Sequence, residues 1–265
     1  MRLIKKSRYI LIPFSLLYCL IICIRNFCYG RHIFKIYKLN TKVISVGNIS
    51  WGGTGKTPLV ESLANMLLKQ GRKPAVLIRG YGRDEEALFS GLAPGVRVMA
   101  GRDRVKNAKA LLAESSLDTI LLDDGFQYRR LKRDFDIVCI DVTDPLGNNW
   151  LIPAGSMREG LSSLKRADVL LLTRVDLAED NKVLEGLEDK LKKINPHALI
   201  AKAVHMPRYF YRLSDNNIVE IEQLKNRHVV LVSAIGNPNS FEKTISTLGL
   251  RFKKHFIFRD HHWYT

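Results

Sequence analysis

The chain has 265 residues, of which 46% are hydrophobic and 26% are charged, and its 42 Lys and Arg residues outnumber its 26 Asp and Glu residues to give a formal charge of +16. This composition excludes a disordered or fibrous chain and supplies enough apolar material for one large α/β domain or two small ones. The four cysteines are too few and too unevenly spaced to predict a disulfide framework or a zinc site.

The N-terminal segment joins an uncharged apolar run to basic flanks. Residues 9–24 carry no charge, and no Asp or Glu precedes Glu61. Cationic flanks favour a membrane interface, so we predict an uncleaved membrane anchor with a basic juxtamembrane segment over residues 1–41. Residues 9–24 would form a helix of about 24 Å, shorter than a hydrocarbon core of roughly 30 Å, which leaves open whether it crosses the bilayer or enters one leaflet. A signal peptide and a buried core helix are the alternatives, although no small-residue cleavage site follows the run.

Short apolar runs alternate with helical patterns from residue 42 onward. The runs are almost wholly apolar, which is typical of parallel strands buried on both faces of a sheet. They cover residues 43–46, 75–78, 119–123, 136–141, 168–173 and 229–235. Between the first two, Leu59, Leu63 and Leu67 share one face of a helix that Gly71 ends. We predict an α/β fold with a doubly wound, mostly parallel sheet and with ligands at the carboxyl edge of its strands. The predicted division is a main domain over residues 42–180 and a smaller α/β part over 181–265.

A glycine-rich motif follows the first predicted strand. Its position between a strand and a helix predicts a sheet of the P-loop NTPase type. A turn that ends in Gly-Lys-Thr lets backbone N–H groups converge on phosphate oxygens, while Lys56 reaches the β- and γ-phosphates and the Thr57 hydroxyl binds Mg²⁺. The usual first glycine of the motif is replaced by a serine, and two later glycines supply the flexibility; a glycine-rich turn without nucleotide is the alternative. The predicted nucleotide-binding residues are Ser50, Trp51, Gly52, Gly53, Thr54, Gly55, Lys56 and Thr57.

A second motif, Asp123-Asp124-Gly, ends the third predicted strand. A carboxylate at the end of a buried parallel strand beside a phosphate loop can hold Mg²⁺ or its water shell. Adjacent side chains of a strand point to opposite faces, so we expect one of Asp123 and Asp124 to serve the metal with Thr57, without deciding which. An ordinary turn is the alternative. The later run 173–176 resembles a base-reading motif of GTPases, although Asp176 would equally suit a helix cap.

Taken together, these motifs resemble the tetraacyldisaccharide 4′-kinase family. The resemblance rests on the phosphate loop, Asp123–Gln127, Leu151–Gly155 and Arg158-Glu159 in that order. It implies transfer of the γ-phosphate of ATP, with Mg²⁺, to the 4′-hydroxyl of an acylated glucosamine disaccharide 1-phosphate. The product would be lipid IVA of lipid A biosynthesis, made at the cytoplasmic face of the inner membrane. Membrane lipids are a further expected partner, and no protein partner is inferred. Nucleic-acid binding is rejected because the positive charge gathers around an apolar segment.

The same resemblance implies roles for individual residues. Lys56 would stabilise the transferred phosphoryl group, and an Asp–His pair would activate the acceptor hydroxyl, which places the base on His261 and its carboxylate partner on Asp84. A solvated loop acid and an exposed terminal imidazole are the alternatives for this pair. The implied substrate-binding residues are Asn48, Arg104, Gln127, Arg158 and Glu159.

The sequence ends earlier than the family pattern, after Trp263-Tyr-Thr265. We expect either a genuinely short member or a truncated relative that only binds nucleotide. A different class, a membrane-associated P-loop ATPase or GTPase switch, remains the alternative function.

Overall fold

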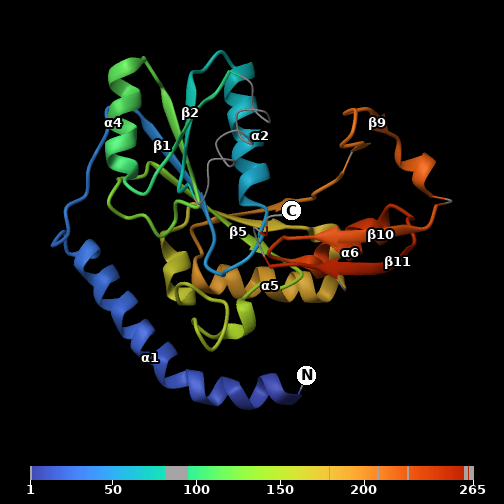
Figure 1. Cartoon of the computed structure of the whole chain (residues 1–265). Helices are drawn as coiled ribbons and strands as arrows, with labels where there is room; N and C mark the ends of the chain where they lie inside the picture. The colour runs from blue at the N-terminus through green and yellow to red at the C-terminus, as the bar shows by residue number, and fades with distance from the viewer. Residues whose placement is uncertain are drawn as a thin grey trace.

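A seven-stranded parallel sheet dominates the computed structural model, which describes residues 2–80, 95–178, 180–207, 209–225, 227–259 and 262. Its spatial order is β3-β2-β4-β1-β5-β6-β7, and every neighbouring pair runs parallel (Figure 1). The strands are β1 (Lys42–Gly47), β2 (Pro74–Ile78), β3 (Arg97–Ala100), β4 (Thr119–Asp123), β5 (Phe135–Asp141), β6 (Val169–Thr173) and β7 (Leu199–Ala203). The predicted doubly wound α/β fold is confirmed.

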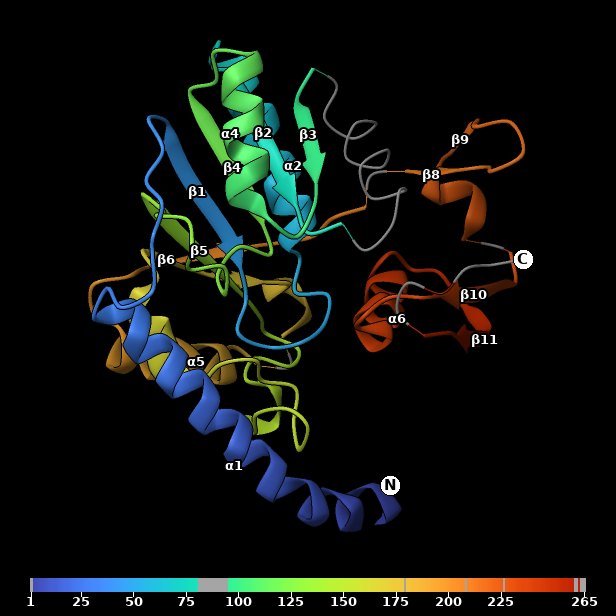
Figure 2. The ribbon, with the colours of Figure 1, turned by 60° about the vertical axis from the view of Figure 1, so that its left-hand side comes forward.

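Helices cover both faces of this sheet (Figures 1 and 2). One face packs on α2 (Lys56–Lys69) through a core cluster that includes Val60 and Ala64. The other face packs on α4 (Arg104–Glu114) and α5 (Asn181–Ile194) through two further clusters. Because both faces are covered, the central strands are apolar throughout instead of alternating. Among the described residues, short 3₁₀ helices lie in the connections: η1 (Gly147–Asn149), η2 (Leu161–Arg166), η3 (Val175–Leu177) and η4 (Ile221–Leu224).

The remaining strands lie outside the main sheet. β10 (Val229–Ser233) and β11 (Phe252–Ile257) form a parallel pair that packs on α6 (Pro238–Thr247), and β8 (Phe210–Tyr211) pairs with β9 (Ile218–Val219). The predicted run 229–235 therefore forms a strand, but with β11 as its partner and not within the main sheet. Conversely, β7 is a strand of the main sheet and α5 packs on that sheet. We therefore propose that the smaller part begins after β7 and not at residue 181.

The N-terminal helix α1 (Arg2–Gly30) extends beyond the predicted apolar run at both ends. Its stretch Ile10–Gly30 has 21 residues and a mean hydropathy of 2.0, which makes it long and apolar enough to cross a membrane. Figure 1 shows α1 lying along the outside of the domain, from its N-terminal end at the bottom of the view to its C-terminal end at the left.

The turn after β1 needs a glycine because another segment approaches it closely. A Cβ atom at Gly47 would overlap the Cβ of Phe126 and lie 2.7 Å from the Phe126 backbone nitrogen. Phe126 is itself completely buried, so it has no room to retreat. This close approach brings the ends of β1 and β4, and with them the two predicted motifs, side by side.

We expect Gly47→Ala to lower the free energy of unfolding by about 1–3 kcal/mol, because the added methyl overpacks a rigid site. Chemical denaturation in detergent, followed by circular dichroism, measures this change. The matched control is Gly186→Ala on α5, where an added Cβ meets nothing within 4 Å and should stabilise the helix by about 0.5–1 kcal/mol. Equal stability of Gly47→Ala and the parent protein would show that Phe126 can move.

Candidate active site

The phosphate loop, residues 48–55, connects β1 to α2 and is held in place by side chains beneath it. The Nδ2 of Asn48 donates to Thr54 Oγ1 at 2.9 Å, and Thr173 Oγ1, at the end of β6, donates to the Thr54 carbonyl oxygen at 3.0 Å. Gly52 and Gly55 have positive φ angles of 123° and 83°, a region that glycine enters without strain. Gly55, the N-cap residue of α2, has no side chain to cap the helix, so the N–H groups of the first turn suit a phosphate.

Lys56, Thr57, Asp123 and Asp124 meet at the carboxyl edge of the sheet. The register that pairs Val46 with Asp123 places the ends of β1 and β4 at the same level. Thr57 Oγ1 donates to Asp123 Oδ2 at 3.0 Å, and Lys56 Nζ lies 3.8 Å from Asp124 Oδ1. The structure thus assembles the predicted lysine, hydroxyl and carboxylates from two separate elements, the start of α2 and the end of β4.

The two carboxyl groups have different electrostatic environments. Burial raises the pKa of Asp124, but hydrogen bonds and charge from Arg158, together with the charge of Lys56, outweigh it and lower the pKa to about 2. Burial also raises the pKa of Asp123, and here the opposing Lys56 charge and Thr57 hydrogen bond do not reverse the shift. Burial lowers the pKa of Lys56, against the attraction of Asp124. Asp124 is therefore the permanent counter-ion of the site.

Asp123 and Thr57 suit a magnesium ion. Asp123 Oδ1 is buried and finds no hydrogen-bond donor in the part of the chain that the structure describes. A divalent cation would satisfy this oxygen and favour the ionised carboxylate. Carboxylate and hydroxyl oxygens, completed by water and phosphate oxygens, are the ligands that Mg²⁺ prefers, so the donor set fits.

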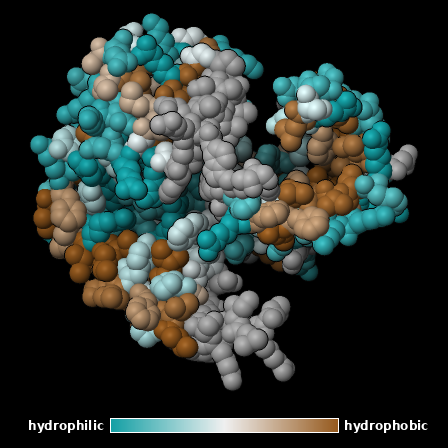
Figure 3. All heavy atoms as spheres, viewed as in Figure 1, coloured by the Kyte–Doolittle hydropathy of each residue, from teal (hydrophilic) through white to brown (hydrophobic). Residues whose placement is uncertain are grey.

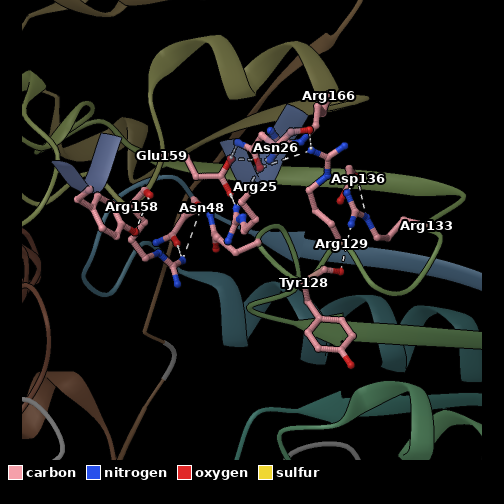
Figure 4. Close-up of polar contacts among 12 residues, drawn as sticks. Arg25, Asn26, Asn48, Tyr128, Arg129, Arg133, Asp136, Arg158, Glu159 and Arg166 are labelled. Atoms are coloured by element: carbon pink, nitrogen blue, oxygen red, sulfur yellow. Dashed lines mark hydrogen bonds and ion pairs between the residues drawn. The ribbon is translucent and has the colours of Figure 1, made fainter. Parts of the chain in front are cut away.

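Arg158 is the centre of the polar contacts around Asp124. Its Nη1 and Nη2 donate to the two Asp124 oxygens at 2.8 and 2.6 Å, and Nη2 also donates to Asn48 Oδ1. Gln127 Nε2 donates to the Asn48 carbonyl oxygen at 2.8 Å. Three of the five predicted substrate-binding residues, Asn48, Gln127 and Arg158, therefore cluster beside the phosphate loop; Figure 4 shows Asn48 and Arg158 together.

The other two predicted substrate-binding residues are engaged by the protein itself. Arg104, 3% exposed, donates to the carbonyl oxygens of Asp123 and Asp124 at 2.7 and 3.0 Å and so fixes the turn after β4. Glu159 is 0% exposed, and its oxygens accept from Arg25 at 2.8 Å and Arg166 at 2.9 Å. Both side chains are buried and hold other parts of the protein in place, and their role toward the substrate stays a prediction.

Asp84 and His261, the predicted base and its partner, lie outside the described residues, as does Glu85. Among the other predicted residues, Ser50 is buried and Trp51 is 68% exposed. Both lie in the phosphate loop, where the Trp51 backbone N–H donates to the Ser156 carbonyl oxygen at 2.6 Å.

A cleft of about 1070 Å³ opens between the phosphate loop and the N-terminal end of α6. Its walls include residues 50–54, Asp141, Asp176 and residues 236–240. Asn237 Nδ2 donates to Asp141 Oδ2 at 2.9 Å, and Arg174 pairs with the same carboxylate. Neither Asp141 nor Asn237 is among the site residues predicted from the sequence. The available signals were a carboxylate at the end of a buried strand and the Gly-Asn-Pro run before a helix.

Comparisons with known proteins agree on one family. The profile of the family described as Tetraacyldisaccharide-1-P 4'-kinase matches residues 7–265. The Tetraacyldisaccharide 4'-kinase of Bdellovibrio bacteriovorus is 32% identical over 96% of this chain and 79% of its own length, and that of Elusimicrobium minutum is 37% identical over 91% and 71%. The crystal structure of LpxK from Aquifex aeolicus in complex with ATP superposes with a TM-score of 0.71 and 34% identity, over 97% of this chain and 83% of that one.

We expect the stabilising effect of Asp124 to disappear in acid. Its folded-state pKa of about 2 lies below the ordinary value of 3.8, so the parent protein should exceed Asp124→Asn in unfolding free energy by about 2 kcal/mol above pH 5. The difference should shrink as the pH falls from about 4 to about 2, because protonation removes the charge that the fold stabilises. Urea denaturation over this pH series measures this difference in unfolding free energy.

The control is Asp215→Asn, which removes an exposed ion pair with Arg212 and should change the free energy of unfolding by less than about 1 kcal/mol. A difference independent of pH would contradict the assignment of Asp124 as the buried counter-ion.

Proposed function

The chain belongs to the tetraacyldisaccharide-1-P 4′-kinase family, and we propose that it transfers the γ-phosphate of ATP to the 4′-hydroxyl of a tetraacylated glucosamine disaccharide 1-phosphate, forming lipid IVA. The observation that carries the proposal is the meeting of Lys56, Thr57, Asp123 and Asp124 at one edge of a parallel sheet. That edge lies beside an apolar N-terminal helix, as an enzyme with an acylated substrate requires.

Phosphoryl transfer needs charge neutralisation and alignment more than covalent chemistry from the protein. Lys56 and the N-terminal N–H groups of α2 would hold the β- and γ-phosphates of ATP. Thr57 and Asp123 would hold Mg²⁺, which supplies further neutralisation of the phosphate charge when bound. The cleft beside Asp141 and Asp176 has the size and the polar walls to receive the nucleoside.

The acceptor hydroxyl would approach from the side of Arg158. Asn48, Gln127 and Arg158 are polar groups beside the phosphate loop, and Asp124 holds Arg158 there as a fixed cation. For proton removal, family resemblance assigns the base to His261 and its partner to Asp84. A correctly placed base contributes about 10²–10⁴-fold in rate.

The enzyme would work at the cytoplasmic face of the inner membrane, where its substrate keeps its acyl chains in the bilayer. Figure 3 shows hydrophobic residues gathered at the lower left, over the place of α1 in Figure 1. The other face of α1 packs on the domain, so we propose that the helix lies in one leaflet, as amphipathic anchors do. Its large exposed apolar side chains are Ile10, Phe14, Leu16, Leu17, Leu20, Ile21, Ile24 and Phe27.

A transfer assay tests the proposed reaction. Purified protein in detergent, with Mg²⁺ and ATP labelled at the γ-phosphate, should move label to tetraacyldisaccharide 1-phosphate. Lys56→Ala should reduce the rate by about 100-fold or more, because the transition state loses its main fixed cation. Label confined to inorganic phosphate in the parent protein would indicate an ATPase and contradict the kinase.

Nucleotide binding is measured in the same samples, through the fluorescence of exposed Trp51 in the phosphate loop. ATP binding without transfer would indicate a relative that only binds nucleotide. Trp51→Phe identifies the part of the signal that comes from the loop.

A further inference from the structure

Helix α1 has a polar stripe that a membrane anchor alone does not need. Ser15, Tyr18, Arg25 and Asn26 follow one another at intervals of three, seven and one residues, which places them on one face of a helix. This face is turned toward the domain, and two of its residues, Ser15 and Ile22, are buried there. The opposite face carries the exposed apolar side chains. The two faces of α1 thus contact different partners.

The stripe bonds mainly to one segment of the domain, residues 151–159, and Asn26 also accepts a hydrogen bond from Arg129 at its carbonyl oxygen, at 2.9 Å. Ser15 Oγ donates to the Leu151 carbonyl oxygen at 2.8 Å and accepts from the Ala154 N–H at 2.9 Å. Tyr18 Oη donates to the Arg158 carbonyl oxygen at 2.9 Å. These bonds hold the main chain of the segment at its beginning, in its middle and at Arg158.

Arg158 is also the residue that holds Asp124. Its backbone N–H donates to the Ile49 carbonyl oxygen at 2.6 Å, and its guanidinium group makes the bidentate contact with Asp124. One residue therefore receives a hydrogen bond from α1 at its carbonyl group and aims its side chain at the counter-ion of Lys56. Tyr18 is separated from Asp124 by Arg158 alone.

Glu159 fixes the same segment from its far end. Its buried carboxylate joins Arg25 and Asn26 of α1 to Arg166 of η2, and Figure 4 shows these groups converging beside Arg158. Removing one partner of a buried ion pair commonly costs several kcal/mol of folding free energy. A substitution at Glu159 would therefore destabilise the protein, and its effect on the reaction could not be separated from that loss. The Tyr18 hydroxyl, a single atom at the surface of the network, is the sharper probe.

We propose that α1 is part of the active-site scaffold and that Tyr18 is a positioning residue, which acts on the reaction through Arg158. This inference rests on the kinase proposed above. The apolar face of α1 contacts lipid, while its polar stripe sets the place of Arg158 and, through it, of Asp124 and Lys56. Docking of the membrane helix and correct geometry at the phosphate loop are then linked.

The test compares Tyr18→Phe with Tyr29→Phe. Both remove one hydroxyl from the same helix, but the Tyr29 hydroxyl makes no hydrogen bond to any residue that the structure describes. With saturating ATP and lipid substrate in detergent, Tyr18→Phe should lower kcat about 3- to 10-fold, because Arg158 loses one of the hydrogen bonds that position it. KM for ATP should change less than two-fold, and Tyr29→Phe should match the parent protein in kcat. Ser15→Ala should act in the same direction as Tyr18→Phe.

A double-mutant cycle distinguishes positioning from a general loss of stability. If Tyr18 acts through Arg158, then Tyr18→Phe should change the single-turnover rate by less than two-fold in an Arg158→Gln background. Asp124→Asn is the second background if Arg158→Gln does not fold, since it breaks the same contact. Thermal unfolding of each single variant shows whether the fold is intact.

Two results would overturn the inference: an unchanged kcat in Tyr18→Phe, or its full effect persisting in the background variant that folds. Either result leaves the kinase proposal standing so long as the parent protein transfers label. Failure of the parent protein to transfer label contradicts the kinase proposal itself.

Discussion

The contact between Asp124 and Arg158 is the interaction on which the rest of the site depends. Asp124 lies 3.8 Å from Lys56 Nζ and accepts two hydrogen bonds from Arg158. A buried carboxylate without partners would be unstable in its charged form, so the two cations make this charge possible and, in return, are held by it. The contact joins the end of β4, the start of α2 and the 151–159 segment. Three parts of the chain that are distant in sequence therefore share one geometry at the phosphate loop.

Helix α1 extends this geometry to the membrane. A helix with only apolar side chains would have no reason to keep a fixed orientation on the domain, because lipid and protein interior solvate such a surface almost equally well. Hydrogen bonds from Ser15 and Tyr18, and the ion pair of Arg25 with Glu159, supply the orientation. The polar groups of α1 thus fix where the lipid-facing surface lies relative to the phosphate loop.

Local sequence patterns predicted the centre of the fold well because burial acts there on both faces of every strand. β1, β2, β4, β5 and β6 were all predicted from apolar runs. β3 and β7, at the two edges of the sheet, were not, since Arg97 and Lys202 interrupt them and they are only partly covered. The phosphate loop was predictable because its chemistry lies within consecutive residues. The partners of Arg104 and Glu159 could not be predicted from the sequence, because these contacts join distant parts of the chain. Arg25 and Glu159, for example, are 134 positions apart.

The Arg158-Glu159 pair shows that two neighbouring residues of one motif can make separate contacts inside the protein. Its sequence suggested two polar groups for a substrate, yet the structure turns Arg158 toward Asp124 and Glu159 toward Arg25 and Arg166. Two neighbouring side chains with opposite charges can each satisfy a different buried partner, and the peptide bond between them transmits the position of one to the other. A motif of this kind connects an anchoring helix to a phosphate loop with two residues. Burial makes the loss of either residue costly, because it would leave the partner charges of that residue unpaired inside the protein.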